Sequence, residues 1–240
     1  MKSDLKIIQN SKGFRFSLDA VLLANFVTVR SGDTVLDLGT GNGVIPLLLS
    51  RISKAKHICG LEIQEEVADM AKRSVMLNGL NERISIVQGD LRQGDKLFDG
   101  KRFSVVVSNP PYTSAGGGII NPEDSKAISR HEITCTLEDV VCASSRLVNS
   151  RGRVALIHRP SRLVDIFLLM RKYNLEPKRV RLVHSRPGRK ANLVLIEAIK
   201  DGRPELEVLE PLYIYRDEFG EEYSAEMERV YSGAKAGEVG

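Results

Sequence analysis

Short apolar runs alternate with longer amphipathic segments along most of this chain. The short runs have the length and composition of buried strands, and the longer segments space their apolar residues as helices do. Strands are expected at 33–38, 57–62, 83–88, 103–108, 152–158, 178–184 and 192–199. Helices are expected at 17–29, 43–53, 64–78, 137–149 and 160–173. This alternation predicts an α/β fold with a doubly wound, mostly parallel, seven-stranded sheet and helices on both faces.

The remaining segments depart from this regular alternation. Residues 1–16 are expected to form an extended or hairpin lead-in, and residues 109–136 form a long connection with three consecutive glycines. Long connections of this kind in compact domains are usually functional or mobile. The run at 206–215 favours one more strand. We therefore expect a main domain at 1–200 and an appendage at 201–240 with a strand, a helix and an acidic, flexible tail.

The tetrapeptide Asn109-Pro110-Pro111-Tyr112 follows the fourth expected strand. The side-chain oxygen of Asn109 can accept one hydrogen of a planar NH2 group, and the backbone carbonyl of Pro110 can accept the other. Proline removes a backbone donor but keeps this acceptor. Tyr112 can stack on the flat group that carries the nitrogen. Asn109, Pro110 and Tyr112 are therefore the candidate catalytic residues, although a strand followed by a plain proline turn would show the same pattern.

A glycine-rich turn follows the first expected strand. Its glycines, which permit a tight turn and close approach by a ligand, are Gly39, Gly41 and Gly43. The second strand ends at Glu62, 25 positions after Asp37, near the spacing of a carboxylate that binds a ribose diol. The third strand leads to Asp90, so three consecutive strands finish beside acids. Doubly wound folds hold nucleotide-like cofactors with a strand, a glycine loop and a helix in this order.

The pattern of these glycines narrows the choice of cofactor. A dinucleotide fingerprint needs a glycine where this chain has Val44. The turn has no positive charge to meet a pyrophosphate, and no Gly-Lys-Ser or Gly-Lys-Thr follows it, which excludes a Walker loop. A cofactor with a ribose and an adenine but no phosphates fits better. A nicotinamide-dependent oxidoreductase is therefore the weaker alternative.

These motifs together resemble those of a known enzyme class. The glycine turn, the Glu after the second strand, the Gly-Asp after the third and the Asn-Pro-Pro-Tyr after the fourth resemble the ordered motifs of class I S-adenosylmethionine-dependent amino-methyltransferases. From 13 to 198 the chain resembles a narrower family, which methylates N6 of the adenine beside the anticodon of a valine tRNA. The resemblance implies a Rossmann-like methyltransferase sheet and S-adenosylmethionine as the cofactor.

The resemblance also implies roles for individual residues. Asp37 would contact the amino-acid part of the cofactor, and Glu62 would accept hydrogen bonds from the ribose hydroxyls. Asp90 would accept a hydrogen bond from the cofactor's adenine amino group, while the backbone N–H of Leu91 donates to a ring nitrogen. Asp19, near the start of the first helix, is interpreted as a capping group, although the resemblance places its segment near the methionine end of the cofactor.

Positive charge is concentrated in one part of the chain, although the formal net charge is only +4. Residues 151–190 hold twelve Lys or Arg and two Asp or Glu, a local net of +10, whereas residues 201–240 hold four and eleven, a local net of −7. Five cations near one expected turn are the candidate nucleic-acid contacts: Arg179, Arg181, Arg186, Arg189 and Lys190. A solvated strand face, or a basic face covered by the acidic tail, would carry the same charges.

Composition limits the remaining possibilities. The three cysteines form no C-x-x-C pair, so neither a disulfide framework nor a metal site is expected. No apolar run reaches the ~18 residues of a transmembrane helix, and the N-terminus lacks the apolar core of a signal peptide. We therefore expect a cytoplasmic monomer whose partner is RNA, with tRNA favoured, and which binds neither membrane nor metal.

Two further alternatives remain for the function. The tetrapeptide also suits other planar amines: a guanine N2 in ribosomal RNA, an adenine in DNA, or a glutamine amide in a protein. The basic segment favours nucleic acid over a protein amide, and the lack of a large recognition domain disfavours sequence-specific DNA modification. A non-catalytic RNA-binding protein is disfavoured because Asp37, Glu62, Asp90 and Asn109 are all intact.

Overall fold

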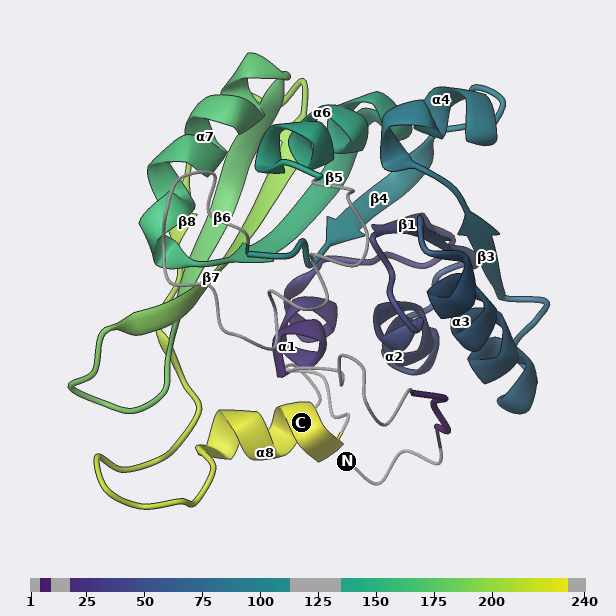
Figure 1. Ribbon diagram of the computed structural model, residues 1–240. Coiled ribbons are helices and arrows are strands. Elements are labelled where there is room, and N and C mark those ends of the chain that lie inside the picture. The colour runs from purple at the N-terminus through teal and green to yellow at the C-terminus, as the bar shows by residue number, and fades with distance from the viewer. Residues whose placement is uncertain (1–4, 10–17, 113–134, 233–240) are drawn as a thin grey trace.

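The computed structural model describes residues 5–9, 18–112 and 135–232 (Figure 1). Its strands are β1 (Thr34–Leu38), β2 (His57–Glu62), β3 (Ile84–Gln88), β4 (Phe103–Ser108), β5 (Val148–His158), β6 (Leu175–His184), β7 (Ala191–Lys200), β8 (Glu207–Val208) and β9 (Leu212–Tyr213). Its helices are α1 (Leu18–Phe26), α2 (Val44–Ile52), α3 (Glu65–Leu77), α4 (Gly94–Leu97), α6 (Leu137–Leu147), α7 (Leu163–Lys172) and α8 (Ala225–Ser232). Two 3-10 helices, η1 (Leu91–Gln93) and η2 (Pro160–Arg162), precede α4 and α7. The expectations for 113–130, for the start of the first helix at 17 and for the tail beyond 233 lie outside the described residues.

The order of the strands reverses at β1. The path through the sheet is β3-β2-β1-β4-β5-β7-β6-β8, and β9 also pairs with β6. The pairs from β3 to β5 are parallel, whereas β7 is antiparallel to both β5 and β6. Leu38, the last residue of β1, lies opposite Leu61 on one side and Ser108 on the other. The residues that follow β1, β2 and β4 therefore meet at one edge, where doubly wound sheets bind their ligands.

Helices cover both faces of the sheet. α1, α2 and α3 lie on one face, and α4, α6 and α7 lie on the other (Figure 1). Successive strand residues point to opposite faces, so Val35 packs in the first core and Leu36 in the second. Strands covered on both sides are mostly apolar, as β4 is through its valines at 105–107. Among the described helices, none is long and apolar enough to cross a membrane.

The segment after β7 packs on the main sheet. β8 and β9 pair in parallel with β6, and α8 contacts α1 and β9. Met227 of α8 is fully buried in the first core. The rings of Tyr215 and Tyr223 stack with their centres 5.6 Å apart, and Tyr231 contacts Tyr223. Apolar and aromatic contacts thus hold this segment against the edge of the sheet.

The sheet is larger than the seven strands that the sequence predicts. The run at 206–215 forms two short strands, because Pro211 lies between them and proline cannot donate to a ladder. The sheet therefore has nine strands. β6 starts at Leu175, before the expected strand, because the pairing with β7 shifts register after Pro177 and a bulge accommodates this proline. Nothing in the apolar pattern indicates α4, since four residues are too few to show a helical period.

Gly60 of β2 lets the glycine turn lie close to the sheet. A β-carbon at this position would lie 2.8 Å from Cγ2 and Oγ1 of Thr40 and 2.9 Å from Cδ1 of Ile86. We predict that Gly60→Ala lowers the free energy of unfolding by about 1–3 kcal/mol, because the buried Thr40 side chain must shift. Urea unfolding followed by circular dichroism measures this loss.

Gly220→Ala is the matched control for this substitution. Its β-carbon would have no neighbour nearer than 3.6 Å. Its effect on the free energy of unfolding should stay within about 0.5 kcal/mol. Wild-type stability in Gly60→Ala would contradict the close packing of the turn on β2.

Candidate active site

The glycine-rich turn after β1 crosses the end of β2. The backbone N–H groups of Gly39 and Thr40 both donate to the carbonyl of Leu61, at 2.9 and 3.0 Å. Gly39, Gly41 and Gly43 have φ values of 71°, 58° and 83°, which glycine adopts without strain. α2 begins directly after Gly43. The turn therefore lies beside the positive end of the α2 dipole, next to the ends of β1 and β4.

Asp37 of β1 is an acid buried within the sheet. The side chain is 0% exposed, and neither carboxylate oxygen has a partner among the described residues. Burial raises the pKa of Asp37 to about 7; the Thr40 hydroxyl opposes this shift, and the Glu62 charge adds to it. The Thr40 hydroxyl does not reach hydrogen-bond geometry, and it too is buried without a partner in the described structure. Such groups are rare in folded proteins, so these atoms fit a ligand that donates hydrogen bonds, such as an ammonium group.

Glu62 at the end of β2 is held in place by backbone donors. Its Oε2 accepts from the N–H of Gly41 at 2.9 Å, and its Oε1 accepts from the N–H of Gln64 at 3.0 Å. The side chain is only 5% exposed. Each carboxylate oxygen can accept a second hydrogen bond. The geometry of Glu62 therefore suits the predicted contact with two ribose hydroxyls.

Asp90 and Leu91 lie just after β3. The Asp90 carboxylate caps η1 and pairs with the Arg92 guanidinium, with Nη2 and Oδ2 2.5 Å apart. The hydrogen bonds that the Arg92 side chain donates to this carboxylate lower the pKa of Asp90. Leu91 is the first residue of η1, where a backbone N–H has no partner inside the helix. The backbone N–H of Leu91 is therefore free of helix hydrogen bonds and suits the predicted donation to an adenine ring nitrogen. The adenine amino group, in contrast, would have to share the Asp90 carboxylate with Arg92.

Asn109 and Pro110 follow β4 beside the glycine turn. Asn109 is half-buried and Pro110 is buried. The hydroxyl of Ser108 donates to the carbonyl of Leu38 at 2.8 Å, which ties the end of β4 to the end of β1. This link gives Ser108 a structural role. It also brings the two acceptors of the motif close to the turn that begins at Gly39.

Tyr112 points towards α1. Its hydroxyl oxygen lies 2.6 Å from Oδ2 of Asp19 and 3.1 Å from Oδ1 of Asn109. Burial raises the pKa of Tyr112 far above its usual value, and the Asp19 charge adds to this shift. The hydroxyl therefore keeps its proton. Asp19 therefore contacts the motif directly. Its interpretation as a helix-capping group did not predict this contact.

His158, the last residue of β5, and Arg159, which follows it, are two residues for which the sequence predicted no role. The His158 ring meets the Tyr112 ring edge-on, with centres 5.0 Å apart, and the Arg159 guanidinium lies 5.0 Å from the centre of the same ring. Burial lowers the pKa of His158 to about 4, and the charges of Arg162 and Arg159 lower it further. His158 is therefore neutral. A polar pair at the carboxyl end of a buried parallel strand is the signal that would have found them.

Two of the five predicted nucleic-acid contacts are engaged within the protein. Arg179 of β6 pairs with Glu197 of β7 at 3.2 Å. Arg181 makes a two-pronged ion pair with Glu226 of α8, with N–O distances of 2.6 and 2.7 Å. Each of these guanidinium groups already has a carboxylate partner. Both arginines therefore link elements of the fold and offer little charge to a phosphate.

The other three predicted contacts lie in the turn between β6 and β7. This turn projects beyond the rest of the sheet (Figure 1). Arg186 lies 4.4 Å from the centre of the Tyr215 ring and donates to the carbonyl of Gly220. Arg189 and Lys190 are exposed, and neither takes part in an ion pair of the described structure. These two cations are therefore available to a partner.

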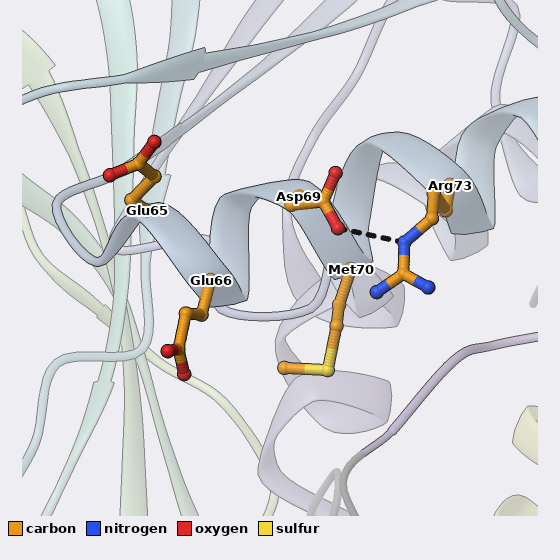
Figure 2. Close-up of a pocket in the computed structure, with 5 residues that line it drawn as sticks. All are labelled: Glu65, Glu66, Asp69, Met70 and Arg73. Carbon is orange, nitrogen blue, oxygen red and sulfur yellow. Dashed lines mark ion pairs between the residues drawn. The ribbon is translucent and has the colours of Figure 1, made fainter.

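A surface pocket of about 450 Å³ lies along α3, outside this constellation (Figure 2). Its lining residues are Glu65, Glu66, Asp69, Met70 and Arg73. Arg73 pairs with Asp69 at 2.8 Å, so Glu65 and Glu66 leave the lining net negative. The pocket includes none of the predicted site residues, and its charge disfavours a phosphate.

Known proteins resemble this chain along most of its length. Residues 17–121 match the family model described as Methyltransferase small domain. A tRNA1(Val) (adenine(37)-N6)-methyltransferase of Porphyromonas gingivalis is 30% identical over 197 residues, which cover 80% of this chain and 76% of that protein. The chain belongs to the methyltransferase family of this relative. A protein of the same name from Bacteroides thetaiotaomicron is 29% identical over 219 residues, covering 89% of this chain and 88% of the relative.

The fold of this methyltransferase also matches solved structures. A predicted O-methyltransferase of Agrobacterium tumefaciens superposes with a TM-score of 0.74 at 24% identity, over 91% of this chain and 98% of that one. TrmN of Thermus thermophilus superposes with a TM-score of 0.52 at 19% identity, over 75% of this chain and 47% of that one. These likenesses show a Rossmann-like methyltransferase fold. The cofactor is S-adenosylmethionine. The carboxylate of Asp37, which has no hydrogen-bond partner among the described residues, and the anchored Glu62 fit its ammonium and ribose groups.

Asp37 should make the stability of this methyltransferase depend on pH. An unfolded aspartate ionises above about pH 4, whereas the pKa of Asp37 in the fold is about 7. Between these values the folded state binds more protons, so the free energy of unfolding falls as the pH rises. We predict that Asp37→Asn raises the free energy of unfolding of the cofactor-free protein by about 1–4 kcal/mol at pH 8, and by less than half as much at pH 5. Urea unfolding at both pH values measures the difference.

Asp69→Asn, which changes an exposed aspartate of α3, is the control. It should alter the free energy of unfolding by less than about 0.5 kcal/mol at either pH. Asp37→Asn should also weaken S-adenosylmethionine binding at least about ten-fold, because a charged hydrogen bond is lost. A variant that is less stable than wild type at pH 8 would contradict the assigned ionisation.

Proposed function

We propose that this enzyme transfers a methyl group from S-adenosylmethionine to N6 of adenine 37 in a valine tRNA. The main support is the position of Asn109 and Pro110, whose acceptors lie at the end of β4 beside the glycine turn. The names of the curated relatives specify the same base and the same tRNA. We further propose that the enzyme acts as a monomer in the cytoplasm.

The two acceptors, which together we call the grip on the target amine, have an electronic effect: they are the side-chain oxygen of Asn109 and the backbone carbonyl of Pro110. An adenine N6 is a poor nucleophile, because its lone pair is delocalised into the ring. Hydrogen bonds from its two amino hydrogens to Asn109 and Pro110 favour a pyramidal nitrogen with a directed lone pair. S-adenosylmethionine supplies the electrophilic methyl group. Positioning and electrostatic stabilisation are therefore the main contributions of the protein.

The target base must leave the stack of the anticodon loop to reach this grip. Tyr112 offers a ring on which it would stack, and one side of that ring carries the guanidinium of Arg159. The His158 ring also packs against the Tyr112 ring, so an incoming adenine would have to displace at least the guanidinium to stack on this ring. Arg159 is exposed at the end of β5, so it is well placed for the phosphate of the target nucleotide.

Asn109→Ala should lower methyl transfer at least about 100-fold, because one of two preorganised acceptors is lost. The affinity for S-adenosylmethionine, measured by calorimetry, should remain close to that of the wild type. Transfer of tritiated methyl groups to tRNA, followed by nucleoside mass spectrometry, measures the loss and identifies the product.

Asn78→Ala provides the control, since its side chain bonds the backbone of Lys6 and Ser74 away from the motif. It should retain methyl transfer. Wild-type turnover by Asn109→Ala would contradict the grip. A methylated guanosine in place of N6-methyladenosine would show that the enzyme acts on a different amine.

Arg189→Gln combined with Lys190→Gln should weaken tRNA binding. Loss of two phosphate contacts should reduce the slope of log affinity against log salt concentration by about 2. Filter binding at several salt concentrations measures the slope. Arg181→Gln is the contrasting variant: it breaks the pair with Glu226 and should lower thermal stability while the slope is unchanged. An unaltered slope in the double variant would remove this turn from the RNA surface.

A further inference from the structure

We propose that Asp19 is a positioning residue, which sets the orientation of the Asn109 amide through the hydroxyl of Tyr112. The inference rests on the proposed function, because it concerns how the same site presents its acceptor to the target amine. Asp19 lies in the first turn of α1, and Tyr112 and Asn109 follow β4. The three side chains meet at a single atom, the Tyr112 hydroxyl oxygen.

The argument depends on the single proton of that hydroxyl. Two possible acceptors lie within reach, Oδ2 of Asp19 at 2.6 Å and the Asn109 amide at 3.1 Å. A carboxylate is the stronger acceptor, and a short O–H···O distance is typical of a hydrogen bond to a charged oxygen. The Tyr112 proton is therefore donated to Asp19. The hydroxyl oxygen is left with lone pairs and no hydrogen for Asn109.

The Asn109 amide must then donate to Tyr112. The oxygen and nitrogen of an amide are distinguished by their hydrogen bonds and not by their shape. An amide oxygen facing a hydroxyl that has no proton to give would make no hydrogen bond, so the amide turns its NH2 towards Tyr112. The amide oxygen then points away from Tyr112 and is free to accept a hydrogen from the target amine. The order of donors runs from Asn109 to Tyr112 to Asp19.

The surroundings of Tyr112 support this direction. His158 packs against the ring edge-on, and its Nδ1 already accepts the backbone N–H of Arg159 at 2.8 Å. The Arg159 guanidinium lies over the ring and not at the hydroxyl. Among the described residues, Asp19 and Asn109 are thus the hydrogen-bond partners of the Tyr112 hydroxyl. Without Asp19, the Tyr112 proton would turn to Asn109 and compete with the target for the amide oxygen.

A double-mutant cycle with Asp19→Ala and Tyr112→Phe tests the inference. The readouts are kcat and KM for tRNA methylation, S-adenosylmethionine affinity by calorimetry and thermal stability. Each single variant should lower kcat about ten-fold, the worth of one hydrogen bond to a charged group, with KM and cofactor affinity within about three-fold. The double variant should be no slower than Tyr112→Phe alone, because Asp19 acts only through the hydroxyl. Asp19→Asn, which keeps an acceptor of the same size, should restore most of the lost kcat.

Tyr173→Phe is the matched control, because this tyrosine also donates to a carboxylate, Glu138 at 2.7 Å, without contact to the motif. Its kcat should equal that of the wild type. Additive losses in the Asp19 and Tyr112 cycle, an unchanged kcat in Asp19→Ala, or a loss explained by weaker cofactor binding or unfolding would each overturn the inference. The product of the wild-type enzyme tests the proposed function separately. If no N6-methyladenosine forms in tRNA, the proposed function is wrong. The cycle can then still be measured on whichever amine is methylated, so the two failures are distinguishable.

Discussion

The site depends on one constraint of topology: β1 pairs with β2 on one side and with β4 on the other. The strand order grows outward from β1 in both directions, so the helices that follow β1 and β4 in the described structure lie on opposite faces. α2 follows β1 on one face, and α6 covers the other (Figure 1). This divergence leaves the carboxyl edge open to a ligand. The glycine turn, Glu62 and Asn109 line that edge because each directly follows or ends one of these strands.

The buried polar groups of the site at this edge lower the stability of the ligand-free fold. Asp37 and Thr40 are buried without hydrogen-bond partners among the described residues, which is unfavourable in an apolar environment. The two cores on either side of the sheet offset this cost, since β1 and β4 are packed on both faces. The charge that suits Asp37 to an ammonium group is therefore the same charge that its burial disfavours. A bound ligand that donates hydrogen bonds to Asp37, as proposed for the cofactor, would offset the cost of that burial.

The local part of this arrangement could be predicted from the sequence, and the long-range pairings could not. Buried strands and the three glycines leave patterns within a few residues, so β1 to β4 and the turn were expected close to their observed positions. No local pattern connects Tyr112 with Asp19, which lies 93 positions earlier. Likewise, Arg181 and Glu226 are 45 positions apart. His158 stands at a strand end, which is a signal that the sequence offers, but its contact with Tyr112 emerges only from the structure.

Because charged residues pair with partners that are distant in the sequence, the charge of a segment is a poor guide to the charge on the surface. The segment 151–190 has a local net of +10, yet Arg153 is buried against Asp33 and Arg181 is paired with Glu226. Carboxylates that are distant in the sequence neutralise particular arginines, and others take part in no ion pair of the described structure. Because β7 is antiparallel to both β5 and β6, these two strands run the same way, and the turn after β6 lies at the same edge as Arg159. Arg189 and Lys190, which take part in no ion pair of the described structure, therefore share an edge with Asn109. This is the edge at which the proposed RNA substrate would present its base.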